Sequence, residues 1–206
     1  MRTIRRDGEH ELEIKRSRFI CALARVSDEE AAREFIARRR KEHWNAGHNC
    51  TAYVLGDDGG VQRSSDDGEP AGTAGVPMLE VLRHRAMTDT VAVVTRYFGG
   101  VKLGSGGLIR AYGNAVSTAI DALGVLERRR LLVVDVHTDY VIGGRLESDL
   151  RDSRFHVRDV AYEDRVRVEV ALPEEDLSDF EVRLAELTGG KADLEVRGTT
   201  VVDVEP

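Results

Sequence analysis

The chain has 206 residues, of which 41% are hydrophobic, and a formal net charge of −7. This length allows one or two domains, and no apolar run approaches the ~20 residues that a membrane span needs. The basic N-terminus has no apolar stretch behind it, and Cys21 and Cys50 form no CxxC pair. We therefore expect a cytoplasmic protein, not a secreted or membrane-embedded one.

Charge is distributed unevenly along the chain. Residues 131–206 hold 9 Lys and Arg against 19 Asp and Glu, a net charge of −10, which leaves 21 against 18, or +3, for residues 1–130. This asymmetry predicts a domain boundary near 127–130, between a domain at 1–126 and another at 131–206. It also argues against nucleic-acid binding along the whole chain, because phosphate repels an acidic face.

The first 55 residues predict a strand pair over 11–14 and 19–26, a helix from Asp28 to His43 and a strand over 49–55. Asp28 is the expected N-cap. The basic run at 38–41 predicts a solvated helix end, with a phosphate-binding patch as the less favoured alternative. The spacing of His43, His48 and Cys50 matches no structural zinc pattern, so packed or hydrogen-bonded roles are favoured over metal binding.

A polar, acidic segment follows at 64–70. Its carboxylates, Asp66, Asp67 and Glu69, form a possible acidic-loop site for Mg²⁺, although Asp-Asp-Gly is also ordinary turn composition and we favour a turn. Thr73 is the expected N-cap of the next helix, which tolerates Pro77 in its first turn.

The centre of the chain reads as a strand, a glycine-rich loop and a helix start. Residues 90–95 form a β-branched run typical of a strand buried on both faces. Five glycines lie between 99 and 107, and apolar residues then fall at 108, 112, 115, 116, 119, 120 and 123, the spacing of a helix with one packed face.

A glycine-rich loop before a helix favours a bound anion, because the first amides of the helix have no internal partner and glycine permits close approach. The alternative is that the glycines only shape a tight turn; neither the Walker loop nor the dinucleotide fingerprint fits. We hypothesise that the helix starts after Thr73 and Ser105 form one shared anion site at one end of the sheet. The expected anion- or nucleic-acid-binding residues are Arg96, Tyr97, Gly99, Gly100, Lys102, Gly104, Ser105, Gly106, Gly107, Arg110 and Thr73.

The last third predicts a second domain. Strands are expected at 131–138, 155–161, 165–172 and 194–204, with helices at 140–151 and from Pro173 to Leu187. This βαββαβ order is that of a ferredoxin-like sandwich. No serine or cysteine lies directly beside a histidine in this part of the chain, and we expect no catalytic residue there.

Three motifs resemble those of the IMPACT/YigZ family. They are TRYFGGVKLGSGGLIRAY at 95–112, SDDGEPAGTAG at 65–75 and HNCTAY at 48–53, in the family's order and without departures. The resemblance covers about residues 10–125, and the tail is similar to the second domain of bacterial members. It implies an α+β protein of two domains: a two-layer α/β domain like domain IV of elongation factor G, and a ferredoxin-like sandwich like its RNA-facing domain V.

The resemblance also implies a role near translation, because eukaryotic relatives regulate translation in the stress response. The leading interpretation is a non-enzymatic regulator of translation or stress response, whose N-terminal domain binds RNA, the ribosome or a translation-related protein. The alternative is a protein or enzyme that binds a nucleotide or another phosphate-containing small molecule through the loop at 99–107. We expect no cofactor, no resident metal and no membrane partner.

Overall fold

The computed structural model describes residues 1–205 and divides the chain into two compact units. The first comprises Met1–Arg128 and the end of the chain from Val204, and the second comprises Arg129–Asp203. No helix within residues 1–205 is both long enough and apolar enough to cross a membrane. No loop separates the units, because the strand β7 (Val125–Thr138) runs through the boundary.

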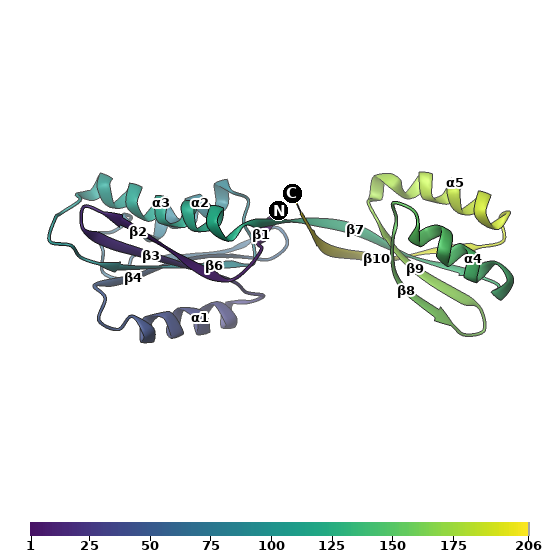
Figure 1. Ribbon diagram of the computed structural model, residues 1–206, viewed down its shortest axis with the longest axis horizontal. Helices are drawn as coiled ribbons and strands as arrows, with labels where there is room; N and C mark the ends of the chain where they lie inside the picture. The colour runs from purple at the N-terminus through teal and green to yellow at the C-terminus, as the bar shows by residue number, and fades with distance from the viewer. Residues whose placement is uncertain (206) are drawn as a thin grey trace. The chain divides into compact units, whose positions relative to one another are not determined.

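The first unit is built on a five-stranded antiparallel sheet in the order β2-β3-β6-β4-β5 (Figure 1). Its strands and helices are β1 (Arg2–Ile4), β2 (Gly8–Ile14), β3 (Ser17–Arg25), α1 (Glu29–Glu42), β4 (His48–Leu55), β5 (Val61–Ser65), α2 (Gly75–His84), β6 (Thr90–Tyr97) and α3 (Ser105–Leu123). β6 lies at the centre and is buried from Thr90 to Arg96, which confirms the prediction of a strand buried on both faces.

Helices cover both faces of this sheet. α2 and α3 lie on one face, over a core that includes Phe19, Leu23 and Tyr112, and α1 lies on the other (Figure 1). The smaller core under α1 contains Phe35 and Tyr53. Alternation along each strand assigns successive side chains to these two faces. The Asp28 carboxylate accepts the Ala31 amide at 2.8 Å, which confirms the predicted N-cap of α1.

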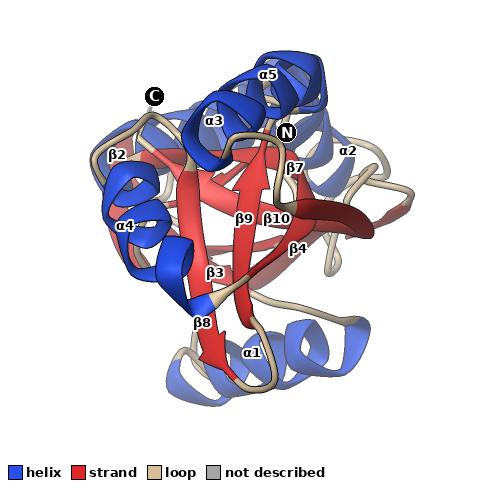
Figure 2. Cartoon of the chain, turned by 90° about the vertical axis from the view of Figure 1, so that its right-hand side faces the viewer, coloured by secondary structure: helices blue, strands red, loops and turns tan. Residues whose placement is uncertain are grey.

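The second unit has the βαββαβ order of a ferredoxin-like domain, as predicted. It contains most of β7, then α4 (Tyr140–Arg151), β8 (His156–Tyr162), β9 (Val166–Leu172), a 3-10 turn (Glu174–Asp176), α5 (Leu177–Thr188) and β10 (Asp193–Val204). In its sheet β7 pairs with β9 and β9 with β8, while β10 and β1 both pair with β7. Both helices contribute to one core with β7 and β9. Figure 2 shows β8 and β9 side by side in red, with α4 and α5 in blue. The chain is therefore an α+β protein with two domains.

Five local features differ from the sequence expectations. β7 begins at Val125 and not at residue 131, so it crosses the predicted domain boundary. β1 and β5 were not expected, because β1 has only three residues and β5 is a polar edge strand held by pairing with β4. Pro173 precedes a 3-10 turn, and α5 begins only at Leu177. Thr73 is not an N-cap: α2 begins at Gly75 with Ala74 at the N-cap position.

Candidate functional site

The loop after β6 packs against the turn between β2 and β3. A Cβ atom on Gly99 would lie 2.0 Å from the backbone of Arg16, so only glycine allows this approach. The Gly99 amide donates to the Ser17 hydroxyl at 3.2 Å. Lys15 and Arg16 form the tip of the turn, with φ values of 48° and 65°. The contact therefore brings two cations from the first hairpin to the glycine-rich loop.

α3 begins immediately after this loop, and its first amides receive no side-chain cap from the described chain, residues 1–205. Its N-cap is Gly104, with φ of 72°, and Ser105 and Gly106 are exposed. The first turn of a helix has amides without helical partners, and the macrodipole places partial positive charge there. The start of α3 is thus open to an anion.

Four exposed cations lie on α3, on the loop before it or on the hairpin turn packed against that loop, and we call them the basic end: Lys15, Arg16, Lys102 and Arg110. Within residues 1–205 none of them forms an ion pair. Lys15 and Arg110 border one hollow of about 240 Å³, whose wall includes Leu103 and Gly107. Leu103 and Lys102 border a second hollow on the other side of the loop.

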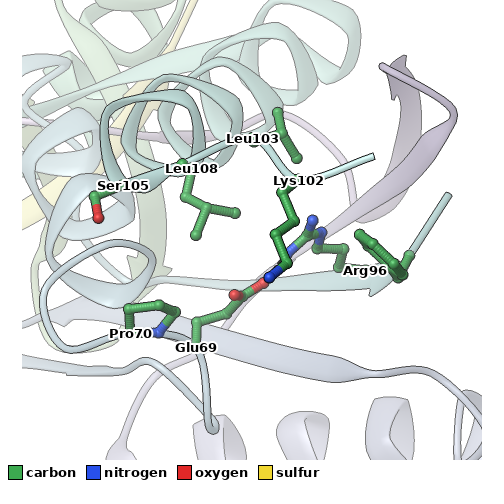
Figure 3. Close-up of a pocket in the computed structure, with 9 residues that line it drawn as sticks. Glu69, Pro70, Arg96, Lys102, Leu103, Ser105 and Leu108 are labelled. Atoms are coloured by element: carbon green, nitrogen blue, oxygen red, sulfur yellow. Dashed lines mark hydrogen bonds and ion pairs between the residues drawn. The ribbon is translucent and has the colours of Figure 1, made fainter. Parts of the chain in front are cut away.

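Figure 3 shows the residues that line this second hollow, which we call the α3 recess. Its volume is about 310 Å³. Its lining combines apolar surface with charge and comes from the acidic loop, the end of β6 and the start of α3: Glu69, Pro70, Arg96, Phe98, Lys102, Leu103, Gly104, Ser105 and Leu108. A recess of this size is at the lower end of the range for small-molecule sites, which span roughly 300–1,000 Å³.

Arg96 and Glu69 form a buried ion pair in the wall of the recess. Arg96 Nη1 donates to Glu69 Oε1 at 2.7 Å, and the exposed fractions of the two side chains are 7% and 3%. The Tyr112 hydroxyl donates to the same carboxylate oxygen at 2.7 Å. Burial is the main cause of a raised pKa for Tyr112, so this hydroxyl stays protonated and acts as a donor. Glu69 Oε2 faces His48 Nε2 at 3.9 Å.

The neighbouring carboxylate of Asp66 occupies the start of α2. It accepts hydrogen bonds from the amides of Gly72, Ala74 and Gly75 at 2.8–3.0 Å. Burial opposes ionisation of Asp66, but these three bonds together outweigh it and hold its pKa below the ordinary value. The Thr73 hydroxyl is turned away and donates to the Pro70 carbonyl. The expected shared anion site is therefore wrong at α2, whose amides already have an anion.

The other acidic-loop side chains also bond within the chain. Asp67 accepts from the Asn49 amide at 2.7 Å and pairs with Arg40, while Glu69 holds Arg96 and Tyr112. Over residues 1–205, no group of three His, Cys, Asp or Glu side chains is arranged to hold a metal ion. The acidic loop is thus a hydrogen-bonded structural element that shapes one wall of the recess.

Tyr97 is separated from the recess by the sheet. Alternation along β6 puts Arg96 on the α3 face and Tyr97 on the α1 face, where the Tyr97 hydroxyl lies 2.8 Å from His43 Nδ1. Arg39 Nη2 lies 2.9 Å from His43 Nε2. Burial, and then the Arg39 charge, lower the pKa of His43, so the neutral ring is favoured.

Two of the four cations in the basic run at the end of α1 are paired with acidic residues. Arg39 pairs with Glu9 and Glu42, and its side chain is only 12% exposed. Arg40 pairs with Asp67 at 2.9 Å. These pairs weaken the alternative of a phosphate-binding patch at 38–41, since an external phosphate would have to displace the carboxylates.

Two features of the site were missed from sequence. Lys15 and Arg16 belong to the basic end only because the hairpin packs on Gly99, and the sequence signal for that contact is a single glycine. Glu69, considered before only as a possible metal ligand, is the partner of Arg96. A lone arginine at the end of an apolar strand indicates that a carboxylate lies nearby, but not which one.

The arrangement offers groups that can bind an anion beside an exposed ring. It offers open amides, unpaired cations and an exposed ring, Phe98, beside the recess. The only nucleophilic hydroxyl lining the recess, that of Ser105, makes no hydrogen bond to a histidine or carboxylate of the described residues. Burial raises the pKa of the nearby Cys50 thiol to about 12, which keeps it protonated and unreactive.

Comparisons with known proteins cover both units. The Impact N-terminal domain model matches residues 15–120, and a domain of unknown function (DUF1949) matches residues 136–191. The IMPACT family member YvyE of Bacillus subtilis is 50% identical over 93% of this chain and 88% of its own length. The IMPACT family member YigZ of Escherichia coli is 39% identical over 88% of this chain and 90% of its own.

A solved structure supports the same relationship. A crystal structure described as that of a hypothetical protein is 37% identical to this chain and covers 94% of it, with 95% of that chain matched and a TM-score of 0.60. Sequence and fold therefore agree along almost the whole chain. This chain belongs to the IMPACT family.

Proposed function

We propose that the first unit is a non-enzymatic module that acts in translation or in a stress response by binding RNA, either free or in the ribosome. The proposal rests on one observation: within residues 1–205 the start of α3 has no side-chain cap, and the four cations of the basic end, which form no ion pair, lie on α3, on the loop before it and on the hairpin turn packed against that loop. Such a surface favours a polyanion, because each phosphate contact releases counterions from the nucleic acid. Membership of the IMPACT family supports a regulatory role.

The second unit is a poorer candidate for RNA contacts. It contains most of the acidic segment at 131–206, and two arginines on its sheet already form ion pairs with Asp135. Arg167 Nη1 lies 3.3 Å and Arg197 Nε 2.8 Å from this carboxylate, whose side chain is 3% exposed. Binding a phosphate there would require breaking these pairs and leaving Asp135 buried without compensation. RNA contacts are therefore expected at the basic end.

A compact phosphate-containing small molecule is the second candidate. The apolar part of the recess, formed by Pro70, Leu103 and Leu108, favours it. Such a ligand would use the α3 amides and Lys102 without reaching the hairpin cations. The two candidates therefore differ in their dependence on Lys15 and Arg16.

The salt dependence of binding tests the proposal. If all four cations of the basic end contact phosphates of single-stranded RNA, the slope of log K against log salt should be about −2.8, from roughly −0.7 per contact. Lys102→Ala in the full chain should weaken binding and make the slope shallower by about 0.7. Lys41→Ala, an exposed cation at the end of α1, is the matched control and should leave both quantities unchanged.

A labelled 12-nucleotide RNA followed by fluorescence anisotropy provides the measurement. Binding that is independent of salt, or equal losses in the Lys102 and Lys41 variants, would contradict the proposal. A shallow slope together with an unchanged Lys15→Ala/Arg16→Ala variant would favour the small-molecule candidate. Absence of RNA binding would leave a translation-related protein as the partner to be sought.

A further inference from the structure

The guanidinium of Arg96 has more donors than the chain satisfies. It has five N–H groups and cannot lose its charge, yet within residues 1–205 its only hydrogen bond runs from Nη1 to Glu69. Its Nε is buried without a partner and its Nη2 makes no hydrogen bond to a described residue. The side chain is 7% exposed and borders the α3 recess. Buried donors in native proteins are nearly always satisfied by protein groups or by water, so a ligand in the recess can use the donors that Glu69 leaves free.

The same guanidinium lies against an exposed aromatic ring. The centroid of the Phe98 ring is 5.6 Å from Arg96 Cζ, and that of the buried Phe19 ring is 5.5 Å away. Phe98 is 59% exposed although it borders the recess. The Phe98 ring therefore contacts the Arg96 guanidinium and is also exposed to solvent, so another flat group can stack on it. Exposed aromatic rings in basic surroundings stack nucleobases in single-strand-binding proteins.

The carboxylate of Glu69 limits how much phosphate the recess can hold. Its Oε1 is occupied by Arg96 and Tyr112, while Oε2 makes no hydrogen bond to another residue of 1–205 and lies 3.9 Å from His48 Nε2. Oε2 therefore remains an acceptor for an N–H or O–H donor, and its charge repels a phosphate. The favourable place for phosphate is the uncapped start of α3, beside Lys102.

From these contacts we infer that the α3 recess binds one unpaired nucleotide of an RNA strand. Its base stacks on Phe98 and its phosphate lies at the first amides of α3, while acceptor atoms of the nucleotide use the free donors of Arg96. The volume of about 310 Å³ suits a single nucleotide and not a base pair. A base within a duplex is already stacked and paired, so the site selects single-stranded RNA. This inference rests on the proposed function and adds that the bound RNA is single-stranded.

The test compares one RNA sequence as a single strand and as a blunt duplex, using the full chain and fluorescence anisotropy at fixed salt. The single strand should bind at least tenfold more tightly. Phe98→Ala should weaken single-strand binding roughly tenfold and leave duplex binding unchanged, since stacking acts only on an unpaired base. Ile109→Ala, an exposed apolar residue of α3 that does not line the recess, should bind as the unchanged protein does.

A tryptophan at the same position gives a direct signal. Phe98→Trp keeps a stacking ring, so it should retain single-strand affinity, and its fluorescence should be quenched by single-stranded RNA but not by duplex. Equal affinity for strand and duplex, or a Phe98→Ala variant with unchanged single-strand binding, would overturn the inference while the salt-dependent proposal stood. Absence of binding to either RNA would overturn both.

Discussion

Asp66 and Arg96 show how single residues determine which helix start can accept a ligand. Asp66 fills the start of α2 with a carboxylate from within the chain, through three amide hydrogen bonds. α3 has a similar glycine-rich start but no side-chain cap from residues 1–205. Beside the start of α3, the free donors of the buried Arg96 favour an acceptor from outside the chain. The amides at the start of α2 are thus bonded within the chain, whereas those at the start of α3 are open to a ligand.

Removing the Asp66 charge should destabilise the first unit in a pH-dependent way. Asp66→Asn should lower the free energy of unfolding by roughly 2 kcal/mol at pH 7, since hydrogen bonds to charged groups contribute about 1.5–3 kcal/mol. The folded-state pKa of Asp66 is lowered, so its charge stabilises the fold above the unfolded pKa of about 3.9. That contribution is lost as the pH falls through the folded pKa.

Urea unfolding at pH 7, 5 and 3.5, followed by circular dichroism, gives the measurement. The difference between Asp66→Asn and the unchanged protein should shrink at pH 3.5. Asp164→Asn is the matched control, because Asp164 makes no hydrogen bond to another described residue. A pH-independent difference would contradict the electrostatic explanation of the cap.

At the scale of elements, the packing of the glycine-rich loop on the β2–β3 turn depends on the close approach of Gly99 to the Arg16 backbone. Gly99→Ala would place a methyl group 2.0 Å from the Arg16 backbone, so one segment must move. We expect a loss of roughly 2–3 kcal/mol from overpacking and weaker RNA binding, as the hairpin cations shift. Gly100→Ala is the control: φ is 84° there, but no atom lies within 4 Å, so about 1 kcal/mol is expected.

Thermal unfolding and RNA anisotropy of both variants check this prediction. A Gly99→Ala protein as stable as Gly100→Ala would show that the contact between loop and turn is dispensable. Unchanged RNA affinity in a folded Gly99→Ala protein would show that the hairpin cations do not need this placement.

Local sequence predicted the elements whose stabilising contacts are themselves local. The Asp28 cap, the apolar run of β6 and the βαββαβ order could be read directly, because capping and periodicity act over a few residues. β5 was missed because its polar residues are held by pairing with β4. Thr73 was misassigned because Asp66, several residues earlier, satisfies the α2 amides. Arg96 and Glu69 are 27 residues apart in the sequence, so their pairing could be identified only from the folded structure.

At the scale of the whole molecule, the boundary between the two units falls within one strand. Residues 125–127 of β7 pair with β1, and residues 132–138 pair with β9. The boundary predicted near 127–130 contains Arg128, Arg129 and Arg130, the last two exposed. Limited trypsin digestion should therefore cut first after 128–130 and leave two folded fragments, each with its own core. A first cut before Val125 or deep inside either unit would contradict this boundary.

The tip of the first hairpin is conformationally costly for the residues that occupy it. Lys15 and Arg16 both adopt positive φ, where Asn-Gly is the favoured pair and other residues add strain of order 1 kcal/mol or more each. Replacing them by Asn and Gly would relieve that strain and delete half of the basic end. Selection for thermal stability alone would therefore favour a firmer hairpin with weaker ligand binding, so stability and binding conflict within these two residues.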